Sequence, residues 1–517
     1  MPRITGRTPA FVSSVLAAAF ISVIPATAQL NHGCPALGAN DFKMTTVIAR
    51  STGIDEPIKM ALDADAQGNV DIYFVERMGG VKKYSGATKA VTQLATIPIW
   101  NGYEDGLTGI ALDPGFKTNG WMYLYWGKGT SEKLYAFRVS RFTLKDGKLD
   151  MASEKAVLEI PANGTKMHTG GAMTFDGAGD LWITTGENQA GEVGTSNTND
   201  LRGKVLRIHP TPEGSYTVPA GNLFAPGTAK TKPEIYVMGA RNPYSISLDV
   251  KRHAVTWGDI GPDGQGITEE YNYTQVPGNF GYPYFAGNNI KLTGTGTADQ
   301  PINANGQNTG LTNLPKAIPA MVSYKQEAAV TGPIYYYDGH LKSDVKMPPH
   351  FDGLWFVTDF QTGTMDTVRM NPAGTAVVAQ GRVFPTFKVD RPIDMKMGPD
   401  GALYVIQYAG WFNAGTTTGI LRIDYSGTCR PELPTAVVPS LMRNPGFRSM
   451  GMSIDITAPG HHALRVSDLR GRCLADFGGE GAHRYDLAAV LAHRGGTYLV
   501  RLETSRGTES RRVVLAE

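Results

Sequence analysis

The chain carries almost no excess of charge of either sign. Its 517 residues include 49 Lys and Arg against 47 Asp and Glu, which gives a net charge of +2 at pH 7. Proteins that bind nucleic acid need a concentrated basic face to neutralise phosphates, and no basic stretch of that length occurs here. We therefore expect no nucleic-acid partner.

Long apolar runs are missing after the first 28 residues. Residues 1–28 place Arg3 and Arg7 before an apolar run from Ala10 to Ile24 and end in Ala26-Thr27-Ala28, a pattern that predicts a secretory signal peptide. A retained membrane anchor is the alternative, but the run is shorter than a membrane span and is interrupted by polar residues. The mature protein is expected to lack a transmembrane segment and to be secreted, periplasmic or at the cell surface.

Cysteine is scarce, with three residues in the whole chain. Cys34 lies at the start of the mature chain and Cys429 at the end of its main part, so a Cys34–Cys429 disulfide would join the two ends in an oxidising compartment. Cys473 would then be left over. Three unpaired thiols are the alternative interpretation.

Glycine and proline are abundant, at 62 and 32 residues, while 41% of the chain is hydrophobic. This composition is typical of many short strands joined by tight turns and not of disorder. A motif of apolar residues, a turn rich in Asp, Gly or Pro, and an aromatic or β-branched strand recurs six times. The copies lie at residues 62–75, 112–125, 175–183, 248–257, 351–357 and 398–405.

Each copy is a strand-turn-strand unit that cannot bury both of its faces alone. Radial stacking of six such units buries them, so the repeats predict an all-β fold with a six-bladed β-propeller over residues 29–430. The unequal spacing of the copies places loops of unequal length on one face, where ligands bind. A β-sandwich is the alternative, but it would give more even spacing.

The sequence changes in character after Cys429. A proline-containing linker is expected at residues 431–452, and the strand patterns of residues 453–517 predict a small C-terminal β-sandwich. Three segments of this tail resemble the C-terminal sorting domains of the type IX secretion route: Asp468–Arg472, Tyr485–Leu487 and Gly496–Val500. The resemblance implies contact with secretion machinery, and a cell-surface or carbohydrate-adhering module is the alternative.

His168 is the strongest candidate for a general base. An unprotonated imidazole suits proton removal near neutral pH, and the following Gly170-Gly171 would let the backbone approach a ligand closely. Glu187 follows the strand Leu181–Thr185, where it could accept the other imidazole N–H and fix the tautomer. The alternative is that both are ordinary loop and turn residues.

A fixed cation and a carbonyl-presenting turn follow along the chain. Arg241 offers a planar guanidinium to a carboxylate or quinone oxygen, and Asn242 adds an amide beside it. Gly261-Pro262 ends a strand in a constrained turn whose carbonyl oxygens would suit a hard cation such as calcium. Taken singly, these segments could equally be an ordinary capped turn and ordinary loop punctuation.

An ordered series of segments resembles the glucose/sorbosone dehydrogenase family over roughly residues 45 to 425. The series comprises Glu104–Leu107, His168–Gly171, Thr185–Asn188, Arg202–Arg207, Gly239–Pro243, Gly261-Pro262 with Glu269-Glu270, Gly278–Pro283, and Arg391–Asp394 with Gly398–Gly401. The resemblance implies a six-bladed propeller that uses pyrroloquinoline quinone and calcium to oxidise aldoses. It also implies that His168 is the general base, that Glu187 orients it, and that Glu104 lies beside it.

The same resemblance assigns the cofactor contacts. Arg241, Asn242 and Arg391 would contact the quinone and its carboxylates, and the carbonyl oxygens of Gly261 and Pro262 would hold the calcium ion. The sequence departs from the family at Gln361, where the best-known soluble glucose dehydrogenases place a lysine against the cofactor. An amide there can donate a hydrogen bond but supplies no charge.

The leading hypothesis is a secreted quinoprotein that oxidises an aldose or oligosaccharide to its lactone and passes electrons to an external acceptor. Met167 precedes the histidine where those same soluble glucose dehydrogenases carry an acid. Together with the neutral Gln361, it leaves room for a non-catalytic propeller that binds carbohydrate at the cell surface. A calcium-dependent lactonase, with Glu187 and Asp259 as metal ligands, is a third alternative. Arg241 would then oppose the metal.

Overall fold

The computed structural model describes residues 33–432 and 447–515, apart from residues 39, 101, 131–132, 263–267, 326–327, 412, 451–452, 457–459, 469–471, 489, 492–495 and 505–506. It divides into two units, Met1–Pro431 and Glu432–Glu517. The predicted signal peptide, residues 1–28, and most of the predicted linker, residues 431–452, lie outside the described residues. Within the described ranges, no helix is long and apolar enough to cross a membrane.

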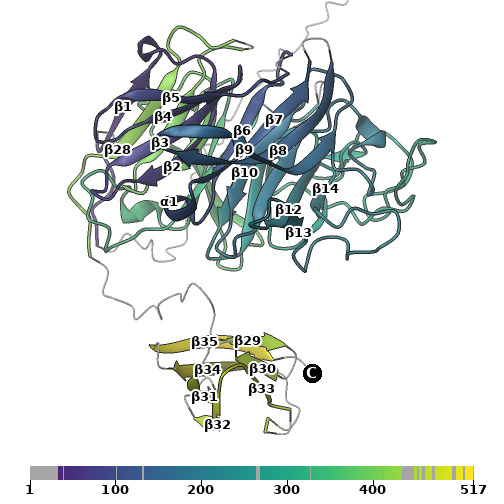
Figure 1. Ribbon diagram of the computed structural model, residues 1–517, viewed down its shortest axis with the longest axis vertical. Helices are drawn as coiled ribbons and strands as arrows, with labels where there is room; N and C mark the ends of the chain where they lie inside the picture. Colours follow the sequence, from purple (N-terminus) through teal and green to yellow (C-terminus); the bar gives the residue numbers. More distant parts are fainter. Residues whose placement is uncertain are drawn as a thin grey trace, which may run out of the picture. The chain divides into compact units, whose positions relative to one another are not determined.

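The first unit is a six-bladed β-propeller, as the six repeats predict, and each blade is built on four antiparallel strands. Blade 1 contains β2 (Pro57–Ala64), β3 (Val70–Glu76), β4 (Gly80–Tyr84) and β5 (Val91–Thr96), all labelled in Figure 1. Blade 2 contains β6 (Leu107–Leu112), β7 (Trp121–Gly129), β8 (Leu134–Lys145) and β9 (Lys148–Pro161). Blade 3 contains β10 (Gly170–Phe175), β11 (Leu181–Thr185), β12 (Lys204–Pro210) and β14 (Ile235–Met238), extended by β13 (Tyr216–Thr217) and β18 (Gly278–Asn279).

The remaining three blades follow the same plan. Blade 4 contains β15 (Pro243–Asp249), β16 (Ala254–Asp259), β17 (Glu269–Thr274) and β21 (Val322–Tyr324). Blade 5 contains β22 (Ala329–Tyr335), β23 (Leu354–Asp359), β24 (Met365–Met370) and β25 (Val377–Val383). Blade 6 contains β26 (Pro392–Met397), β27 (Leu403–Gln407), β28 (Gly419–Tyr425) and β1 (Phe42–Ala49). Short elements in the loops are η1 (Arg50–Thr52), α1 (Phe116–Asn119), η2 (Gly191–Val193), η3 (Pro349–Phe351), β19 (Phe285–Ala286) and β20 (Ile290–Lys291).

The sequence repeats fall on the second strand of each blade and the turn that precedes it. In five blades this turn joins the first two strands, as where Leu62 of β2 pairs with Ile72 of β3. The copy at residues 351–357 begins instead in η3, because a long connection separates β22 from β23. The first strands β2, β6, β10, β15, β22 and β26 each pack against the next, and β26 packs against β2, so they surround a common axis.

Apolar side chains fill the spaces between neighbouring blades. Tyr73 and Val75 of blade 1 pack with Leu124 of blade 2, and Trp182 of blade 3 packs in one cluster with Trp257 of blade 4. Burial stabilises such contacts by about 25 cal/mol for each Å² of apolar surface removed from water. Each blade therefore needs both of its neighbours to bury its two faces.

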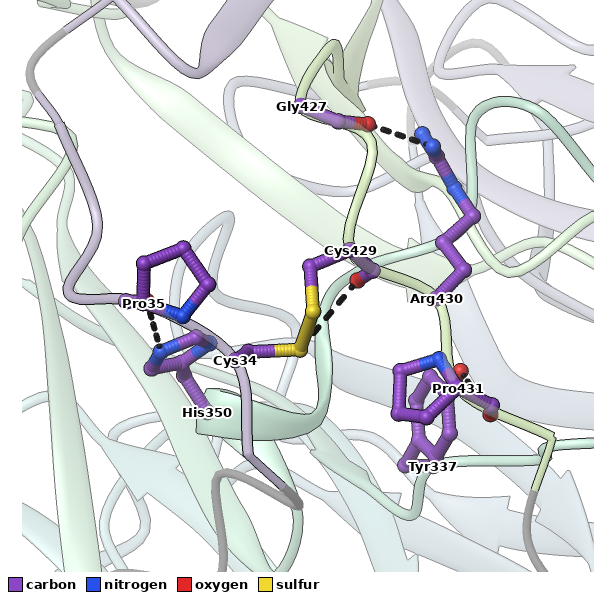
Figure 2. The surroundings of a disulfide bond; sticks show 8 residues. All are labelled: Cys34, Pro35, Tyr337, His350, Gly427, Cys429, Arg430 and Pro431. Atoms are coloured by element: carbon purple, nitrogen blue, oxygen red, sulfur yellow. Dashed lines mark hydrogen bonds between the residues drawn. A yellow bond between two sulfur atoms is a disulfide. The ribbon is translucent and has the colours of Figure 1, made fainter.

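The ring is closed by a strand from the start of the chain, because β1 forms the outermost strand of blade 6. β1 pairs antiparallel with β28, from Phe42 opposite Tyr425 to Ala49 opposite Gly419. Just outside this pair, a Cys34–Cys429 disulfide links the two ends, with 5.7 Å between the Cα atoms (Figure 2). The predicted bridge is confirmed, and Cys473 is a free, exposed cysteine.

Hydrogen bonds surround the disulfide and fix both chain ends to the propeller. His350 Nε2 lies 2.8 Å from the Pro35 carbonyl oxygen, and the Tyr337 hydroxyl donates to the Pro431 carbonyl oxygen at 2.7 Å (Figure 2). The Arg430 guanidinium donates to the Gly427 carbonyl oxygen. These contacts hold both ends of the propeller chain next to the disulfide.

The second unit is a small β-sandwich, as the strand patterns predict. One sheet contains β29 (Phe447–Met450), β30 (Ser453–Ile456) and β33 (His483–Asp486), and the other contains β31 (His461–Ser467), β32 (Cys473–Glu480), β34 (Gly496–Thr504) and β35 (Gly507–Leu515). Buried side chains from both sheets form one core, with Ile454 and Tyr485 from the first and Leu464 and Val500 from the second. The unit has its own hydrophobic core.

We expect loss of the disulfide to destabilise the propeller. A Cys34→Ser, Cys429→Ser variant should lose about 2–4 kcal/mol of unfolding free energy, because the unfolded chain is no longer closed into a loop. All seven tryptophans lie between Trp100 and Trp411, so tryptophan fluorescence during urea unfolding reports on the propeller alone. Cys473→Ser is the matched control and should change nothing. Three free thiols in the denatured wild-type protein would contradict the expectation.

Candidate active site at the propeller axis

A cavity of about 330 Å³ lies where loops from all six blades meet around the axis. Its volume falls within the roughly 300–1,000 Å³ of small-molecule sites. The lining residues are Ile58 and Arg77 of blade 1, Tyr103 and Glu104 before blade 2, Met167 and His168 before blade 3, Arg241, Asn242, Tyr244 and Ile260 around blade 4, Ala328, Val330 and Phe360 around blade 5, and Ile393, Tyr408 and Trp411 of blade 6. Most of them precede a first strand or follow a second strand, positions that share one end of an antiparallel hairpin.

Four lining residues hold the same place in four different blades. Arg77, Ile260, Phe360 and Tyr408 are each the first residue after the second strand of a blade. The second strand of each blade runs toward the end of the ring where the cavity lies, so the first residue after it lies near the axis. Equivalent positions of successive blades therefore line the cavity.

His168 and Glu187 are in direct contact, as the sequence predicts. His168 Nδ1 lies 2.5 Å from Glu187 Oε1, and both side chains are buried. The Gly191 N–H donates to Glu187 Oε2 at 2.7 Å. Burial raises the pKa of Glu187, but the hydrogen bonds from His168 and Gly191 outweigh this and hold the pKa below its ordinary value. With Glu187 ionised, Nδ1–H donates to it, and the network assigns Nε2 as the unprotonated nitrogen.

The approach of Glu187 to His168 depends on Gly186. A Cβ atom on Gly186 would lie 1.9 Å from the His168 carbonyl oxygen. Any other residue at this position would push the end of β11 away from the histidine. The contact between Glu187 and His168 therefore requires a glycine at position 186.

Side chains from both neighbouring blades hold the backbone around His168. Glu104 Oε2 accepts a hydrogen bond from the His168 N–H at 2.8 Å, and Asn242 Oδ1 accepts one from the Gly170 N–H at 3.1 Å. Both residues also line the cavity. The sequence predicts Glu104 beside the base and Asn242 against the cofactor. In the structure both also hold the backbone at the histidine loop, residues 162–169, which joins β9 to β10.

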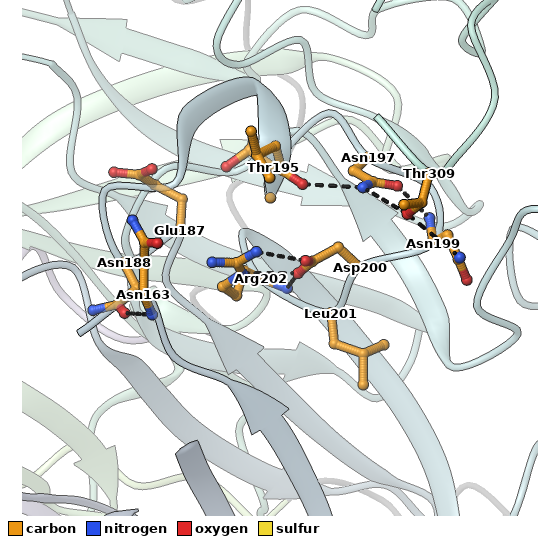
Figure 3. Close-up of polar contacts among 12 residues, drawn as sticks. Asn163, Glu187, Asn188, Thr195, Asn197, Asn199, Asp200, Leu201, Arg202 and Thr309 are labelled. Atoms are coloured by element: carbon orange, nitrogen blue, oxygen red, sulfur yellow. Dashed lines mark hydrogen bonds and ion pairs between the residues drawn. The ribbon is translucent and has the colours of Figure 1, made fainter. Parts of the chain in front are cut away.

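Asn188 holds the same loop from within blade 3. Its side-chain amide donates to the carbonyl oxygens of Met167 and Thr165, at 3.0 and 3.3 Å. Its Oδ1 accepts from the Asn163 N–H at 2.6 Å (Figure 3). Its own backbone N–H donates to the His168 carbonyl oxygen at 3.1 Å. Sequence reasoning singled out the segment Thr185–Asn188 but missed this role.

Arg241 lines the cavity, and a buried carboxylate fixes its turn. Asp259 accepts hydrogen bonds from the backbone N–H groups of Arg241 and Asn242, the latter at 2.7 Å. Burial raises the pKa of Asp259 to about 6, and these N–H donors oppose the rise. The guanidinium donates through Nη1 to the Ile260 carbonyl oxygen at 3.0 Å. Asp259, the acid considered for a lactonase, thus holds the arginine turn through its backbone.

The predicted calcium ligands lie next to the cavity wall. Gly261 and Pro262 follow the lining residue Ile260, and the Gly261 N–H donates to Glu269 Oε1 at 3.2 Å. Among the described residues, no group of three His, Cys, Asp or Glu side chains is placed to hold a metal ion. The ligands predicted here are main-chain carbonyl oxygens and not such side chains, so the calcium site stays a prediction.

Arg391 and Gln361 do not line the cavity. Arg391 lies 3.2 Å from Asp390 Oδ1 through Nη1, and its guanidinium lies 5.7 Å from the ring centre of Trp411, which does line the cavity. Gln361 is exposed in the turn after β23, one residue beyond Phe360. Their contacts with a cofactor stay predictions.

Arg77 is a second cavity arginine that the sequence analysis missed. Its Nη2 forms a buried ion pair of 2.7 Å with Glu56 Oε2, and its Nη1 donates to the Asp105 carbonyl oxygen at 3.2 Å. Four aromatic residues, Tyr103, Tyr244, Tyr408 and Trp411, were also missed. The signal that could have found Arg77 and Tyr408 is their shared position directly after the second strand of a repeat.

Comparison with known proteins gives a consistent family assignment. The sequence profile described as Glucose / Sorbosone dehydrogenase matches residues 54–410. The aldose sugar dehydrogenase YliI of Escherichia coli strain K12 is 26% identical over 356 residues, which cover 68% of this chain and 87% of that protein.

Two solved structures share the fold of the first unit. The soluble aldose sugar dehydrogenase of Escherichia coli, in its apo form, superposes with a TM-score of 0.56 at 22% identity, covering 74% of this chain and 99% of that one. The PQQ-bound form of the aldose sugar dehydrogenase of Streptomyces coelicolor superposes with a TM-score of 0.55 at 20% identity, covering 75% and 99%. At these identities the likeness establishes the fold.

Lys59 lies directly behind the cavity wall. Its Nζ donates to the carbonyl oxygens of Ile58 and Ile393, at 3.3 and 3.2 Å, and lies 3.9 Å from the ring centre of Tyr244. All three neighbours line the cavity. Burial lowers the pKa of Lys59 to about 7, although Asp394 opposes the shift.

The lowered pKa of Lys59 predicts a pH-dependent stability. Between pH 7 and the ordinary lysine pKa of 10.5, the unfolded chain binds this proton more tightly than the folded one, so stability should rise with pH. Lys59→Met should therefore raise the unfolding free energy by roughly 2–3 kcal/mol more at pH 6 than at pH 9. Urea unfolding at both pH values measures the difference.

Lys83→Met is the matched control for this comparison. Lys83 lies in the same blade, and its ion pair with Asp71 helps to raise its pKa above 10.5, so it stays charged in both folded and unfolded chains from pH 6 to pH 9. Its substitution should shift stability equally at the two pH values. An equal shift for Lys59→Met as well would show that Lys59 is not deprotonated near pH 7.

Proposed function

The chain belongs to the glucose/sorbosone dehydrogenase family, and on that premise we propose that it is a pyrroloquinoline quinone-dependent dehydrogenase of an aldose or oligosaccharide. The reaction would oxidise the anomeric carbon and yield a lactone. The observation that carries the proposal is that His168, bonded to the buried Glu187, lines the same cavity as Arg241. A base oriented by a carboxylate, next to a fixed cation, suits removal of a proton beside an anionic cofactor.

The cavity fits a flat, anionic, aromatic cofactor. Its walls are mainly apolar and aromatic, and two arginines, Arg77 and Arg241, are among its lining residues. Arg241 would hold a carboxylate or quinone oxygen of the cofactor, with the Asn242 amide beside it. When bound, the quinone supplies a carbon that accepts hydride. The PQQ-bound Streptomyces coelicolor relative, which shares this fold, supports the choice of cofactor.

His168 would take the proton of the anomeric hydroxyl through Nε2. Because Nδ1–H is held by Glu187, the unprotonated Nε2 is the ring nitrogen left for a substrate. As the proton arrives, the imidazole becomes a cation, and the adjacent Glu187 carboxylate stabilises that charge. The burial of both side chains keeps water from competing for the pair.

Calcium would bind at the Gly261 and Pro262 carbonyl oxygens. Hard cations prefer such oxygen ligands, and both residues directly follow the cavity residue Ile260. Arg391 would approach the cofactor through its contact with Trp411, and Gln361 from the turn after Phe360. These assignments carry over from the family resemblance.

The protein would act outside the cytoplasm and pass electrons to an external acceptor. Residues 1–28 would direct export, and residues 453–517 would serve sorting or attachment at the cell surface. The Cys34–Cys429 disulfide supports this location, because such bonds form and persist in oxidising compartments.

A non-catalytic carbohydrate-binding propeller is the second candidate. Two exposed aromatic residues, Tyr103 and Trp411, lie at the cavity and offer flat apolar surfaces to sugar rings. Such a surface binds sugar whether or not oxidation follows. This candidate predicts sugar binding without electron transfer.

Reconstitution distinguishes the two candidates. Purified protein supplied with calcium and pyrroloquinoline quinone should bleach a redox dye only when an aldose is added, and quinone titration should saturate. Arg241→Ala should weaken quinone affinity about tenfold or more, because a charge-assisted contact is lost. Saturable sugar binding with no bleaching in the reconstituted protein would favour the non-catalytic propeller.

His168→Gln should lower kcat by about 100-fold or more, because glutamine cannot accept a proton. Quinone affinity should stay within about twofold, since the cofactor contacts are assigned to Arg241 and Asn242. Steady-state dye reduction and quinone titration measure the two effects. A variant that keeps its full kcat would remove His168 from the mechanism.

A further inference from the structure

Asp105 is fully buried and directly follows Glu104, which lines the cavity. Its Oδ1 accepts a hydrogen bond from the Thr169 hydroxyl at 2.7 Å, and its Oδ2 accepts one from the Trp100 indole N–H at 3.2 Å. Burial raises its pKa to about 7. A buried carboxylate whose side-chain partners are neutral is costly for folding, which suggests a role besides stability.

The backbone of Asp105 is held by the turn before it and by Arg77 of blade 1. Its N–H donates to the Gly102 carbonyl oxygen at 2.9 Å, and its carbonyl oxygen accepts from Arg77 Nη1 at 3.2 Å. The next residue, Gly106, has φ +155°, and a Cβ atom there would lie 2.1 Å from the Arg77 carbonyl oxygen. Asp105 is therefore a fixed point against which another loop can be held.

Two consecutive acids hold two consecutive residues of the histidine loop. Glu104 accepts from the His168 N–H, and Asp105 accepts from the Thr169 hydroxyl. Thr169 is fully buried, and its carbonyl oxygen accepts from the Tyr125 hydroxyl at 3.1 Å and from the Gly186 N–H at 3.2 Å. Thr169 is thus fixed through both its side chain and its backbone.

His168 needs this support because its backbone is left-handed, with φ +59°. A residue other than glycine keeps such a conformation only where its surroundings determine it strongly. Without the hydrogen bonds to Glu104 and Asp105, the loop would relax toward an ordinary backbone conformation. The imidazole nitrogen of His168 would then turn away from the cavity.

We propose that Asp105 and Thr169 are positioning residues that hold the His168 imidazole in its productive orientation. This inference rests on the proposed function, in which His168 is the base. Neither residue lines the cavity, so neither would touch cofactor or sugar. Their loss should therefore lower the rate of proton removal and leave cofactor binding unchanged, since a misplacement of about 1 Å can cost about 100-fold in rate.

Thr169→Val is the sharpest test, because valine keeps the shape and removes the hydroxyl. In the reconstituted protein kcat should fall by about 10–100-fold, while KM and quinone affinity stay within about twofold. Thr169→Ser restores the hydroxyl and should recover kcat to within about threefold of wild type. A Thr169→Val variant with wild-type kcat would overturn the proposal.

Thr184→Val is the matched control. Thr184 is also fully buried in blade 3, and its hydroxyl accepts from the Ala172 N–H at 3.0 Å and donates to the Ala172 carbonyl oxygen at 3.3 Å, so both hydrogen bonds go to a residue of β10 and not to His168 or Thr169. Its substitution should destabilise the protein comparably but leave kcat unchanged. If both valine variants lost kcat in proportion to their stability, the role of Thr169 would be structural and the proposal would fail.

Asp105→Ala provides a second approach should Thr169→Val not fold. Alanine removes both acceptor oxygens, so the Thr169 hydroxyl loses its partner, whereas an asparagine amide could still donate to that hydroxyl. We expect kcat to fall with quinone affinity unchanged. Unchanged kcat in this variant would overturn the proposal.

A spectroscopic measurement separates failure of this inference from failure of the proposed function. The ¹⁵N shifts of the His168 imidazole, assigned by their loss in His168→Gln, report its tautomer without any turnover. If the wild-type protein showed no dye reduction, the proposed function would fail. The positioning role of Asp105 and Thr169 would still be supported if the His168 shifts changed in Thr169→Val and not in Thr184→Val. Unaltered shifts in Thr169→Val would overturn it.

Discussion

Closure of the ring is the constraint on which the site depends. The cavity takes its lining from all six blades, so its residues come together only when β1 has paired with β28 and blade 6 is complete. The same closure gives blades 1 and 6 the neighbours against which their apolar faces are buried. Closure of the ring therefore both assembles the cavity and buries the apolar faces of the blades.

Within the closed ring, carboxylates do most of the positioning. Glu187 fixes the histidine ring, Glu104 fixes its backbone, and Asp259 fixes the turn that carries Arg241. Asp105 adds a contact to the residue after the histidine. Glu187 and Asp259 join two loops of the same blade, whereas Glu104 and Asp105 join the start of blade 2 to the loop before blade 3.

The sequence predicted the fold well, because hairpin turns and alternating strands are local signals. The six repeats located the blades, the family resemblance is confirmed, and the histidine–glutamate contact is observed. Arg77 and the aromatic wall were missed, since only the closed ring brings them to the axis. Arg391 and Gln361 lie outside the cavity wall for the same reason: the course of a loop depends on packing that no local pattern encodes. The roles of the site residues stay predictions.

The disulfide has a topological consequence. Cys34 and Cys429 are 395 positions apart, so the backbone between them and the sulfur bridge form one covalent circle that encloses every blade. A protease that cuts a single surface loop between these cysteines would open the circle without releasing a fragment. The nicked protein would keep its mass and its blade order until a reductant separated the pieces.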